Sequence, residues 1–252
     1  QAANLTPTPT LVFFHGGGWT TGAKEGAVFS LLPYLDMGWS VVNVEYRTTA
    51  VALAPAAVED ARCALRWIYR NAKQYNFDVS RVVVTGQSAG GHLALMTGLL
   101  DDAAGFDRLC PGDRGTGPRS TEEMKVAAIL NWYGITDVAE MLSGPNTRSY
   151  AVAWFGSMPN RVELAKQLSP LTYVRAGAPP ILTAQGDADP TVPYTQGVRL
   201  HEALTKAGVP NQHVTIPSGK HGGFSDAEMA IAYTAIRSFL DKHVLKEKTT
   251  TN

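Results

Sequence analysis

Short apolar runs rich in valine and isoleucine alternate along this chain with longer segments that have helical periodicity. The clearest run, RVVVTGQ at residues 81–87, leads into an almost wholly apolar helical pattern at residues 89–100. Runs of this kind predict strands that are buried on both faces, and the helices between them return the chain to form a parallel sheet. The alternation therefore predicts an α/β fold with a mostly parallel sheet of about six strands and helices on both faces. The expected strands occupy residues 10–14, 39–46, 81–87, 126–134, 180–186 and 212–217.

The length of the chain and the order of its segments indicate one domain. A chain of 252 residues with 44% apolar content is large enough for a single α/β domain with a substantial core. Residues 107–123 are expected to be a loop excursion, because the strand pattern resumes after them. Residues 137–172 have short helical patterns without a clean strand, so we expect a small helical insertion at about 137–172 within a single domain spanning 1–252. The expected helices occupy residues 27–38, 55–76, 89–100, 194–208 and 226–244.

The balance of charges argues against two classes of partner. The chain carries 22 basic and 22 acidic residues, so it lacks the net positive charge with which proteins attract nucleic acid or an anionic membrane. No apolar run approaches the roughly 20 residues that a transmembrane helix needs. We therefore expect neither nucleic-acid nor membrane partners.

Two features bear on the cellular location of the protein, and neither of them decides it. Cys63 and Cys110 are too few for a zinc framework, and they either form one disulfide bridge or remain two buried thiols. The chain starts at Gln1 rather than Met, which is typical of a processed or trimmed form, and a removed signal peptide leaves no trace. Secreted, periplasmic and cytoplasmic locations all remain open.

The pentapeptide GQSAG at residues 86–90 has the G-x-S-x-G pattern of a nucleophile elbow. It lies between the clearest expected strand and an apolar helix, which is the context that this motif requires. In parallel sheets, ligand chemistry lies beyond the carboxyl ends of the strands, where Ser88 is placed here. The start of the following helix also favours negative charge that develops nearby. Ser88 is therefore the predicted nucleophile.

A serine nucleophile needs an oriented base, and His221 is the best candidate among the six histidines. His221 follows the last expected strand and is flanked by glycine on its C-terminal side, so it lies on a loop at the same edge of the sheet as Ser88. The other histidines lie next to the glycine motifs or within expected helices and strands, and we expect structural or exposed roles for them. They are His15, His92, His201, His213 and His243.

The base in turn needs an acid that fixes its tautomer and stabilises its charged form. Asp187 and Asp189 both follow the next-to-last expected strand. Asp187 comes at the strand tip and is suited to holding the turn through its own backbone. Asp189 lies farther out, before Pro190, and we expect it to reach His221.

The three consecutive glycines at residues 16–18 indicate a place where the backbone must be bare. Attack by Ser88 on an ester carbonyl creates an oxyanion, which preorganised N–H groups must meet. Ala89, directly after the nucleophile, is one expected donor. Gly17 and Gly18 are the other expected donors, and which two of the three glycines donate stays open at this point.

Four aromatic residues are candidates for substrate contact. Trp19, next to the glycines, is suited either to walling an acyl pocket or to packing. Trp132, Tyr133 and Trp154 are candidates for an aromatic surface that binds a sugar or feruloyl ring. For Trp132 and Tyr133, packing in the core is an equally open alternative.

Taken together, these motifs resemble the α/β-hydrolase superfamily, and more narrowly its esterase/lipase branch related to hormone-sensitive lipase. The run at residues 60–96 is similar to bacterial acetyl xylan and feruloyl esterases of that branch, and the resemblance extends over nearly the whole chain from Thr10 onward. The motifs are HGGGW (15–19), GQSAGGH (86–92), GDADPTVP (186–193) and HGGF (221–224).

The resemblance implies an α/β-hydrolase domain with Ser88, Asp189 and His221 as the triad, and with Gly17, Gly18 and Ala89 as oxyanion donors. In one respect the chain departs from the pattern. The family usually has two further strands before the HGGGW strand, whereas only nine residues precede that strand here. A sheet without those strands leaves an exposed edge, so the oligomeric state stays open.

The predicted function is that of a serine carboxylesterase which hydrolyses short-chain acyl or aryl esters through an acyl-enzyme. Acetyl xylan and feruloyl polysaccharide are the expected substrate types, and small-molecule or polysaccharide esters are the expected partners. This chemistry needs no metal or cofactor. Two alternatives remain: an arylformamidase-like amide hydrolase, and a catalytically inactive hydrolase fold used for binding, which would require the loss of a triad residue.

Overall fold

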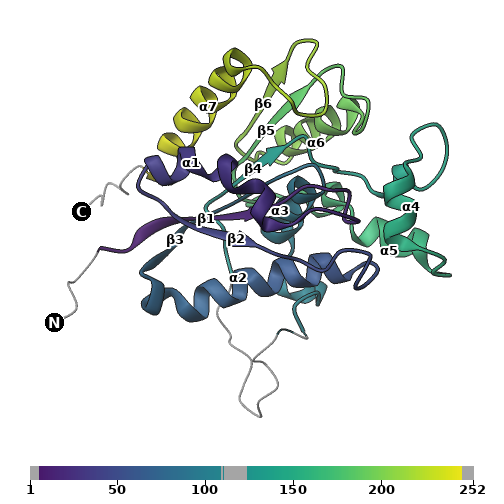
Figure 1. Ribbon diagram of the computed structural model, residues 1–252, viewed down its shortest axis with the longest axis horizontal. Helices are drawn as coiled ribbons and strands as arrows, with labels where there is room; N and C mark the ends of the chain where they lie inside the picture. The colour runs from purple at the N-terminus through teal and green to yellow at the C-terminus, as the bar shows by residue number, and fades with distance from the viewer. Residues whose placement is uncertain (1–5, 109, 111–123, 246–252) are drawn as a thin grey trace.

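The computed structural model describes residues 6–108, 110 and 124–245, and its centre is a six-stranded sheet (Figure 1). The strands follow the order β2-β1-β3-β4-β5-β6, and every neighbouring pair is parallel. In the four inner strands, β1, β3, β4 and β5, the apolar side chains are buried on both faces, which explains their continuous apolar runs. The prediction of a parallel six-stranded α/β fold is confirmed. The strands are β1 (Thr8–Phe14), β2 (Ser40–Val44), β3 (Phe77–Gln87), β4 (Ala128–Trp132), β5 (Ile181–Gly186) and β6 (Asn211–Ile216).

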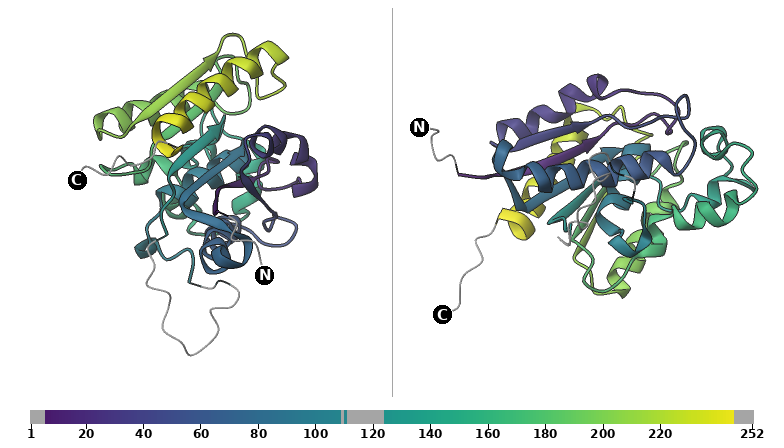
Figure 2. Two further views of the ribbon diagram at one scale, coloured as in Figure 1. Left: turned by 90° about the vertical axis from the view of Figure 1, so that its left-hand side faces the viewer. Right: turned by 90° about the horizontal axis from the view of Figure 1, so that it is seen from below.

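Helices cover both faces of the sheet, as the two further views show (Figure 2). Helices α1 and α7 pack on one face, where Tyr34 and Ile236 join the smaller apolar cluster. Helices α2, α3 and α6 pack on the other face, where Leu65, Leu95 and Leu200 belong to the larger cluster. The helices are α1 (Val28–Asp36), α2 (Ala56–Tyr75), α3 (Ala89–Leu99), α6 (Tyr194–Lys206) and α7 (Asp226–Leu240). Among the described helices, none is both long and apolar enough to cross a bilayer.

The chain between β4 and β5 forms short helices beyond the carboxyl ends of the strands (Figure 1). This segment, called the insertion below, spans residues 137–172. Residues Ala151, Trp154 and Phe155 anchor it, because all three are fully buried in the larger apolar cluster. The insertion therefore lies at the end of the sheet where Ser88 is expected. Its elements are η3 (Ala139–Met141), α4 (Ser149–Phe155), α5 (Arg161–Gln167) and η4 (Pro170–Tyr173).

Strand ends differ from the prediction, and the largest differences in length are in β3 and β4. Strand β3 starts at Phe77, because an irregularity between Pro9 and Thr10 lets β1 pair with β3 over a longer stretch. Strand β4 ends at Trp132, because Tyr133 takes a left-handed backbone (φ 40°) that extended pairing cannot accommodate.

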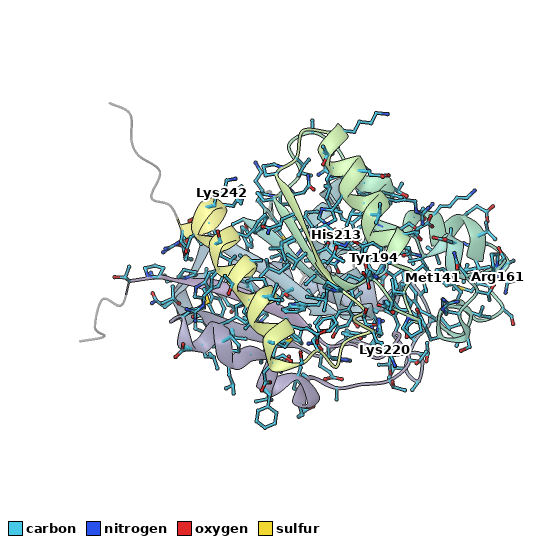
Figure 3. The ribbon with its side chains drawn as sticks, turned by 90° about the horizontal axis from the view of Figure 1, so that it is seen from above. Met141, Arg161, Tyr194, His213, Lys220 and Lys242 are labelled. Atoms are coloured by element: carbon cyan, nitrogen blue, oxygen red, sulfur yellow. A yellow bond between two sulfur atoms is a disulfide. The ribbon has the colours of Figure 1, made fainter. Side chains whose placement is uncertain are left out.

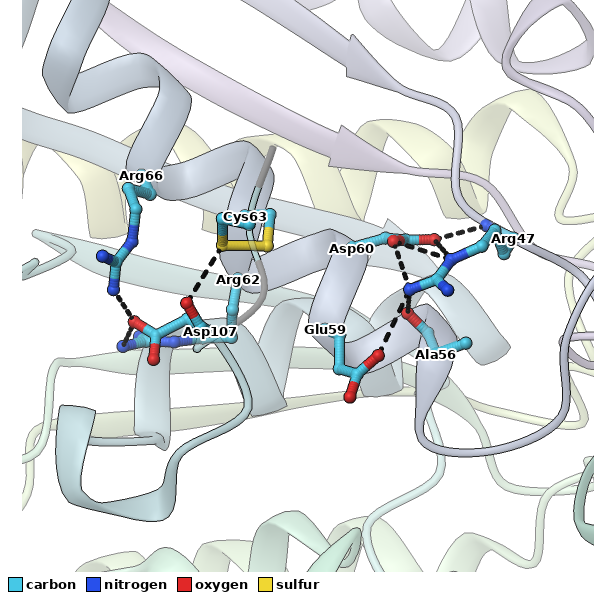
Figure 4. Close-up of a disulfide and its surroundings, with 9 residues drawn as sticks. Arg47, Ala56, Glu59, Asp60, Arg62, Cys63, Arg66 and Asp107 are labelled. Atoms are coloured by element: carbon cyan, nitrogen blue, oxygen red, sulfur yellow. Dashed lines mark hydrogen bonds and ion pairs between the residues drawn. A yellow bond between two sulfur atoms is a disulfide. The ribbon is translucent and has the colours of Figure 1, made fainter. Parts of the chain in front are cut away.

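Cys63 of α2 and Cys110 form a disulfide bridge, so the alternative of two buried thiols is wrong (Figure 4). Beside the bridge, the buried Arg66 of α2 forms an ion pair with Asp107. The neighbouring Arg62 donates hydrogen bonds to carbonyl groups at the end of α3, at 3.0 and 3.2 Å. The bridge and these charged contacts together tie the chain after α3 to α2.

Candidate active site

Ser88 stands on a sharp turn between β3 and α3, with φ 55° and ψ −120°. Such a backbone is strained for a residue with a side chain, and it lifts the side chain away from the sheet. The flanking glycines make the turn sterically feasible. A Cβ atom on Gly86 would lie 2.3 Å from the Gly90 carbonyl oxygen, and one on Gly90 would lie 2.0 Å from the Phe14 carbonyl oxygen. The G-x-S-x-G spacing therefore reflects how closely β1, β3 and α3 approach one another.

The structure brings Ser88, His221 and Asp189 together in one hydrogen-bonded chain. His221 Nε2 lies 2.8 Å from Ser88 Oγ, and His221 Nδ1 lies 2.8 Å from Asp189 Oδ2. The acid's side chain is fully buried, whereas the imidazole is 19% exposed. With Asp189 ionised, Nδ1 carries the proton and donates, which leaves Nε2 free to accept the proton of the Ser88 hydroxyl. The three side chains come from three loops at the carboxyl ends of β3, β5 and β6.

The carboxylate of Asp189 is held by its own turn. Its Oδ1 accepts hydrogen bonds from the N–H groups of Thr191 at 2.8 Å and Val192 at 3.0 Å. These donors aim the other oxygen, Oδ2, at the imidazole of His221. Bonds of this kind to an ionised oxygen are stronger than neutral ones, so they offset part of the cost of burying the carboxylate.

The competing acid, Asp187, has a different contact. Its exposed carboxylate accepts a hydrogen bond from the N–H group of Ser218 at 2.6 Å. Asp187 therefore links the loop after β5 to the loop after β6, which leads to His221. Of the two aspartates, the structure places Asp189 against the imidazole.

The glycine loop passes directly beside the nucleophile. A Cβ atom on Gly16 would lie 3.6 Å from Ser88 Cβ. Gly17 (φ 119°) and Gly18 (φ 58°) take backbone conformations that favour glycine, and a Cβ atom on Gly17 would meet the Thr21 carbonyl oxygen at 2.1 Å. The turn uses the Gly17 carbonyl as acceptor, and none of the hydrogen bonds within the described chain uses the N–H group of Gly17 or Gly18.

The N–H group of Ala89 is a further donor beside Ser88. Ala89 is the first residue of α3, and N–H groups in a first helical turn have no partner within the helix. Together, the N–H groups of Gly17, Gly18 and Ala89 are the predicted oxyanion donors: Ala89 directly follows Ser88, and Gly17 and Gly18 follow Gly16, which lies beside Ser88.

His15 has the structural role expected for it. Its ring stacks on Tyr46 with centroids 4.2 Å apart, and its Nδ1 donates to the Gly16 carbonyl oxygen at 2.7 Å. The Tyr46 hydroxyl donates to the His15 carbonyl oxygen at 2.9 Å. These contacts fix the backbone of His15 and Gly16, at the start of the glycine loop, against the Tyr46 side chain.

The proposed substrate contacts of three tryptophans need correction. Trp19 is fully buried and stacks on Trp154, which is also fully buried, so neither offers a surface to a substrate. Trp132 is only 4% exposed and packs against Tyr233 of α7. Packing is therefore the role of Trp19, Trp132 and Trp154 in this structure. Side-chain direction in a loop or at a strand end is set by tertiary contacts that a local pattern does not encode.

Tyr133 and Tyr150 are aromatic residues that lie close to the triad. The Tyr133 ring lies 4.8 Å from the His221 ring, edge to face. Tyr150 of the insertion covers Gly18, since a Cβ atom there would lie 2.9 Å from Tyr150 Cβ, and its hydroxyl donates to the Thr191 carbonyl oxygen at 3.3 Å. Burial raises the pKa of both phenols, with the nearby Asp189 carboxylate as a smaller cause, so both stay neutral. Sequence reasoning missed Tyr150, because the insertion contains no motif that marks it.

The end of the molecule that carries the triad also carries charged and flexible side chains. Figure 3 places Met141 of the insertion and Lys220, the residue before His221, at this end, with Lys242 at the other. Tyr194 and His213 lie farther along the β5–β6 side, where their rings stack 5.0 Å apart. Lys220 is therefore the cation nearest in sequence to the base.

The buried His92 makes the stability of the fold depend on pH. Burial lowers its pKa to about 4, despite an opposing hydrogen bond to the Leu168 carbonyl. Since its unfolded pKa is near 6.5, the unfolded chain binds more protons between these values, and stability is lost as the pH falls from about 6.5 to 4. The expected loss from this one group is about 3 kcal/mol.

The free energy of unfolding, measured by urea denaturation at about pH 7.5, 5.5 and 4.5, checks this expectation. His213, whose pKa burial also lowers to about 4, adds a loss in the same direction. Because His92→Leu removes this titrating group, the free energy of unfolding of the variant should fall less with falling pH than that of the natural chain. Equal slopes for the two proteins would contradict the assignment to His92.

Comparison with known proteins identifies the family of the chain. The family model described as BD-FAE matches residues 1–204. Esterase LipQ of Mycobacterium tuberculosis is 28% identical over 218 residues, which cover 84% of this chain and 50% of that protein. The chain thus spans about half the length of this and two other curated mycobacterial relatives.

Two solved structures match over more of their length. A truncated carbohydrate esterase from gut microbiota superposes with a TM-score of 0.76 at 28% identity, covering 94% of this chain and 88% of that one. An acetyl ester-xyloside bifunctional hydrolase from Caldicellulosiruptor lactoaceticus superposes with a TM-score of 0.75 at 26% identity, covering 93% and 85%. The proteins that the chain resembles in sequence and in structure carry the names of esterases. The parallel sheet, the match over most of the sequence and these superpositions agree: the chain belongs to the BD-FAE family, within the α/β-hydrolase esterases.

Proposed function

We propose that this chain is a serine carboxylesterase which hydrolyses short-chain acyl or aryl esters through an acyl-enzyme. The observation that carries the proposal is the unbroken hydrogen-bonded chain from Ser88 through His221 to Asp189, with 2.8 Å at each step. A serine, a base and a buried acid in this order are the working parts of acyl transfer.

In the acylation step, Ser88 Oγ attacks the ester carbonyl carbon while His221 Nε2 takes the hydroxyl proton. Asp189 stabilises the imidazolium that forms, because its carboxylate is already oriented by two N–H groups. The carbonyl oxygen becomes an oxyanion beside the N–H groups of Ala89 and the glycine loop, which are aimed before the reaction begins. His221 then returns the proton to the departing alkoxide.

Deacylation repeats these steps with water as the nucleophile. His221 takes a proton from the water molecule, whose oxygen attacks the carbonyl carbon of the acyl-enzyme. The proton then passes to Ser88 Oγ as the carboxylic acid leaves. Both half-reactions use the same oxyanion donors, so one arrangement of the loop serves both.

The substrate proposal is that the ester belongs to a carbohydrate and that the acyl group is acetyl or feruloyl. Its support is the likeness to two proteins that are named for carbohydrate or acetyl ester-xyloside hydrolysis. Tyr150, which is only partly buried, offers a neutral aromatic face of the type that contacts sugar rings or aryl groups. Tyr133 is largely buried in the same apolar cluster as Tyr34, so it follows the packing alternative.

A panel of substrates tests the proposed function. We expect hydrolysis of p-nitrophenyl acetate, with kcat/KM falling by about tenfold or more between the acetate and the octanoate because the buried aromatic side chains behind the glycine loop leave little room. Acetyl xylan and methyl ferulate in the same panel distinguish the two carbohydrate-linked acyl groups. Faster turnover of N-formylkynurenine than of every ester would replace the proposal with an amide hydrolase.

A further inference from the structure

The glycine loop, residues 16–19, contains three consecutive residues with left-handed backbone. Gly17, Gly18 and Trp19 all have positive φ values, and for Trp19 (φ 59°) this conformation is strained because it has a side chain. Within the loop, the Gly17 carbonyl closes a short turn, and the Trp19 carbonyl accepts from the Thr49 N–H group at 3.0 Å. Strain of this kind persists only where the surroundings over-determine it, so the side chain of Trp19 needs a fixed partner.

That partner is His92 on the nucleophile helix. Trp19 Nε1 lies 3.2 Å from His92 Nδ1, and both side chains are fully buried. An indole N–H can only donate, so Nδ1 of His92 must be the acceptor and its proton must sit on Nε2. This Nε2–H group donates to the Leu168 carbonyl oxygen at 2.7 Å. The tautomer of His92 is thereby defined by contacts at both ring nitrogens.

His92 connects directly to the nucleophile. It lies one helical turn after Ser88 on α3, and its N–H group donates to the Ser88 carbonyl oxygen at 3.0 Å. Leu168 directly follows α5 in the insertion as its C-terminal cap. One buried chain of hydrogen bonds therefore joins the glycine loop, the nucleophile helix and the insertion.

We propose that Trp19 and His92 are positioning residues that set the distance between the oxyanion donors of the glycine loop and the nucleophile on α3. Neither side chain is accessible, so neither touches the substrate. The two sets of donors come from separate segments, Gly17 and Gly18 after β1 and Ala89 after β3. The Trp19–His92 hydrogen bond spans these two segments. This inference rests on the proposed function, because an oxyanion must form for the spacing of its donors to matter.

Trp154 supplies a matched control. Its ring stacks on Trp19 with centroids 4.2 Å apart and planes 12° from parallel. Within the described part of the chain, its buried Nε1 has no hydrogen-bond partner. Trp19→Phe and Trp154→Phe thus remove the same ring volume from the same stack, but only the first removes a hydrogen bond.

The experiment measures kcat, KM and the inhibition constant of an aryl trifluoromethyl ketone for both variants. This ketone adds to Ser88 and places an oxyanion against the donors, so its affinity reports their placement. We expect Trp19→Phe to lower kcat for p-nitrophenyl acetate by about tenfold to a hundredfold and to weaken the ketone by a similar factor, with KM changed by less than about threefold. Trp154→Phe should change each quantity by less than about threefold.

A double variant separates positioning from stability. Trp19→Phe with His92→Leu removes both partners of the bond, but it also takes the donor from the Leu168 carbonyl, so a recovery of Tm is not the readout. Because the two single substitutions break the same hydrogen bond, a positioning role predicts that the double variant lowers kcat by no more than about threefold beyond the lower of the two single variants. A merely structural role predicts that the two losses in kcat add. His92→Leu carries the test if Trp19→Phe alone does not fold.

The outcomes are distinguishable from a failure of the proposed function. No turnover of any ester by the natural chain would overturn the proposed function itself. An active natural chain, with Trp19→Phe and Trp154→Phe equally affected in kcat and in ketone affinity, would overturn the positioning role alone.

Discussion

Replacing Ser88 with alanine should lower kcat for p-nitrophenyl acetate by about 10⁴-fold to 10⁶-fold and leave the fold intact. The variant keeps the oxyanion donors and the base, so the small residual rate comes from those parts acting on water. Since Ser88 Oγ is the atom that would form the acyl-enzyme, its removal deletes the covalent route and not merely a contact. No other single substitution in this site has a larger expected effect.

Ser218→Ala is a suitable control for this change. Ser218 also has a left-handed backbone (φ 56°) and lies on a strand-end loop near the triad, but it contacts Asp187 only through its N–H group. Its replacement should keep kcat within about threefold of the natural chain, because the contact does not involve the side chain. Thermal unfolding and circular dichroism of both variants show whether the fold is retained.

A covalent probe gives a second readout for the nucleophile. An alkyl fluorophosphonate should add its phosphonyl group to the natural chain with loss of fluoride, and mass spectrometry should place the added mass on the peptide that contains Ser88. The Ser88→Ala variant should gain no mass. Labelling of that variant, or a kcat within tenfold of the natural value, would contradict the assignment of Ser88 as nucleophile.

The elements of the fold were predictable because their signals are local. A valine run bounded by glycine, as at residues 81–87, specifies a buried strand without reference to the rest of the chain. The ends of strands were less predictable, because they depend on pairing. Strand β3 is extended by an irregularity in β1, and β4 is cut short by the left-handed Tyr133.

The candidate site was predictable to different degrees. Ser88 and His221 follow from spacing, since each lies in a glycine-rich segment directly after an expected strand. The aromatic residues did not follow from spacing. Trp19 turns into the core because Trp154, far away in sequence, stacks on it and His92 accepts its N–H group. Contacts between remote segments of this kind cannot be read from a local pattern.

The two cysteines illustrate the same limit. Composition leaves a bridge and two separate thiols equally open, because the choice depends on whether the chain after α3 returns to α2. In the structure it does return, and the ion pair between Arg66 and Asp107 accompanies the bridge.

Asp189→Asn is the second substitution with a large expected effect, a loss in kcat of about 10³-fold to 10⁴-fold. The amide should keep the two N–H contacts at Oδ1, because its oxygen can occupy that position. Its NH₂ group then faces His221 Nδ1 and favours the tautomer that carries the proton on Nε2. That tautomer presents a donor to Ser88, so it cannot accept the hydroxyl proton. The loss should therefore appear in kcat, with little change in Tm.

Asp187→Asn is the matched comparison, since both aspartates follow β5 and both are replaced by an isosteric amide. The amide oxygen introduced by this substitution can still accept from the N–H group of Ser218, so kcat should stay within about threefold of the natural value. Steady-state kinetics of both variants across pH 6 to 9 (about three pH units, which cover the titration of an ordinary histidine) separates a lost base from a shifted one. If Asp187→Asn instead reduced kcat more than Asp189→Asn, the acid of the triad would have to be reassigned, and the 2.8 Å contact between Asp189 and His221 would have to be a structural one.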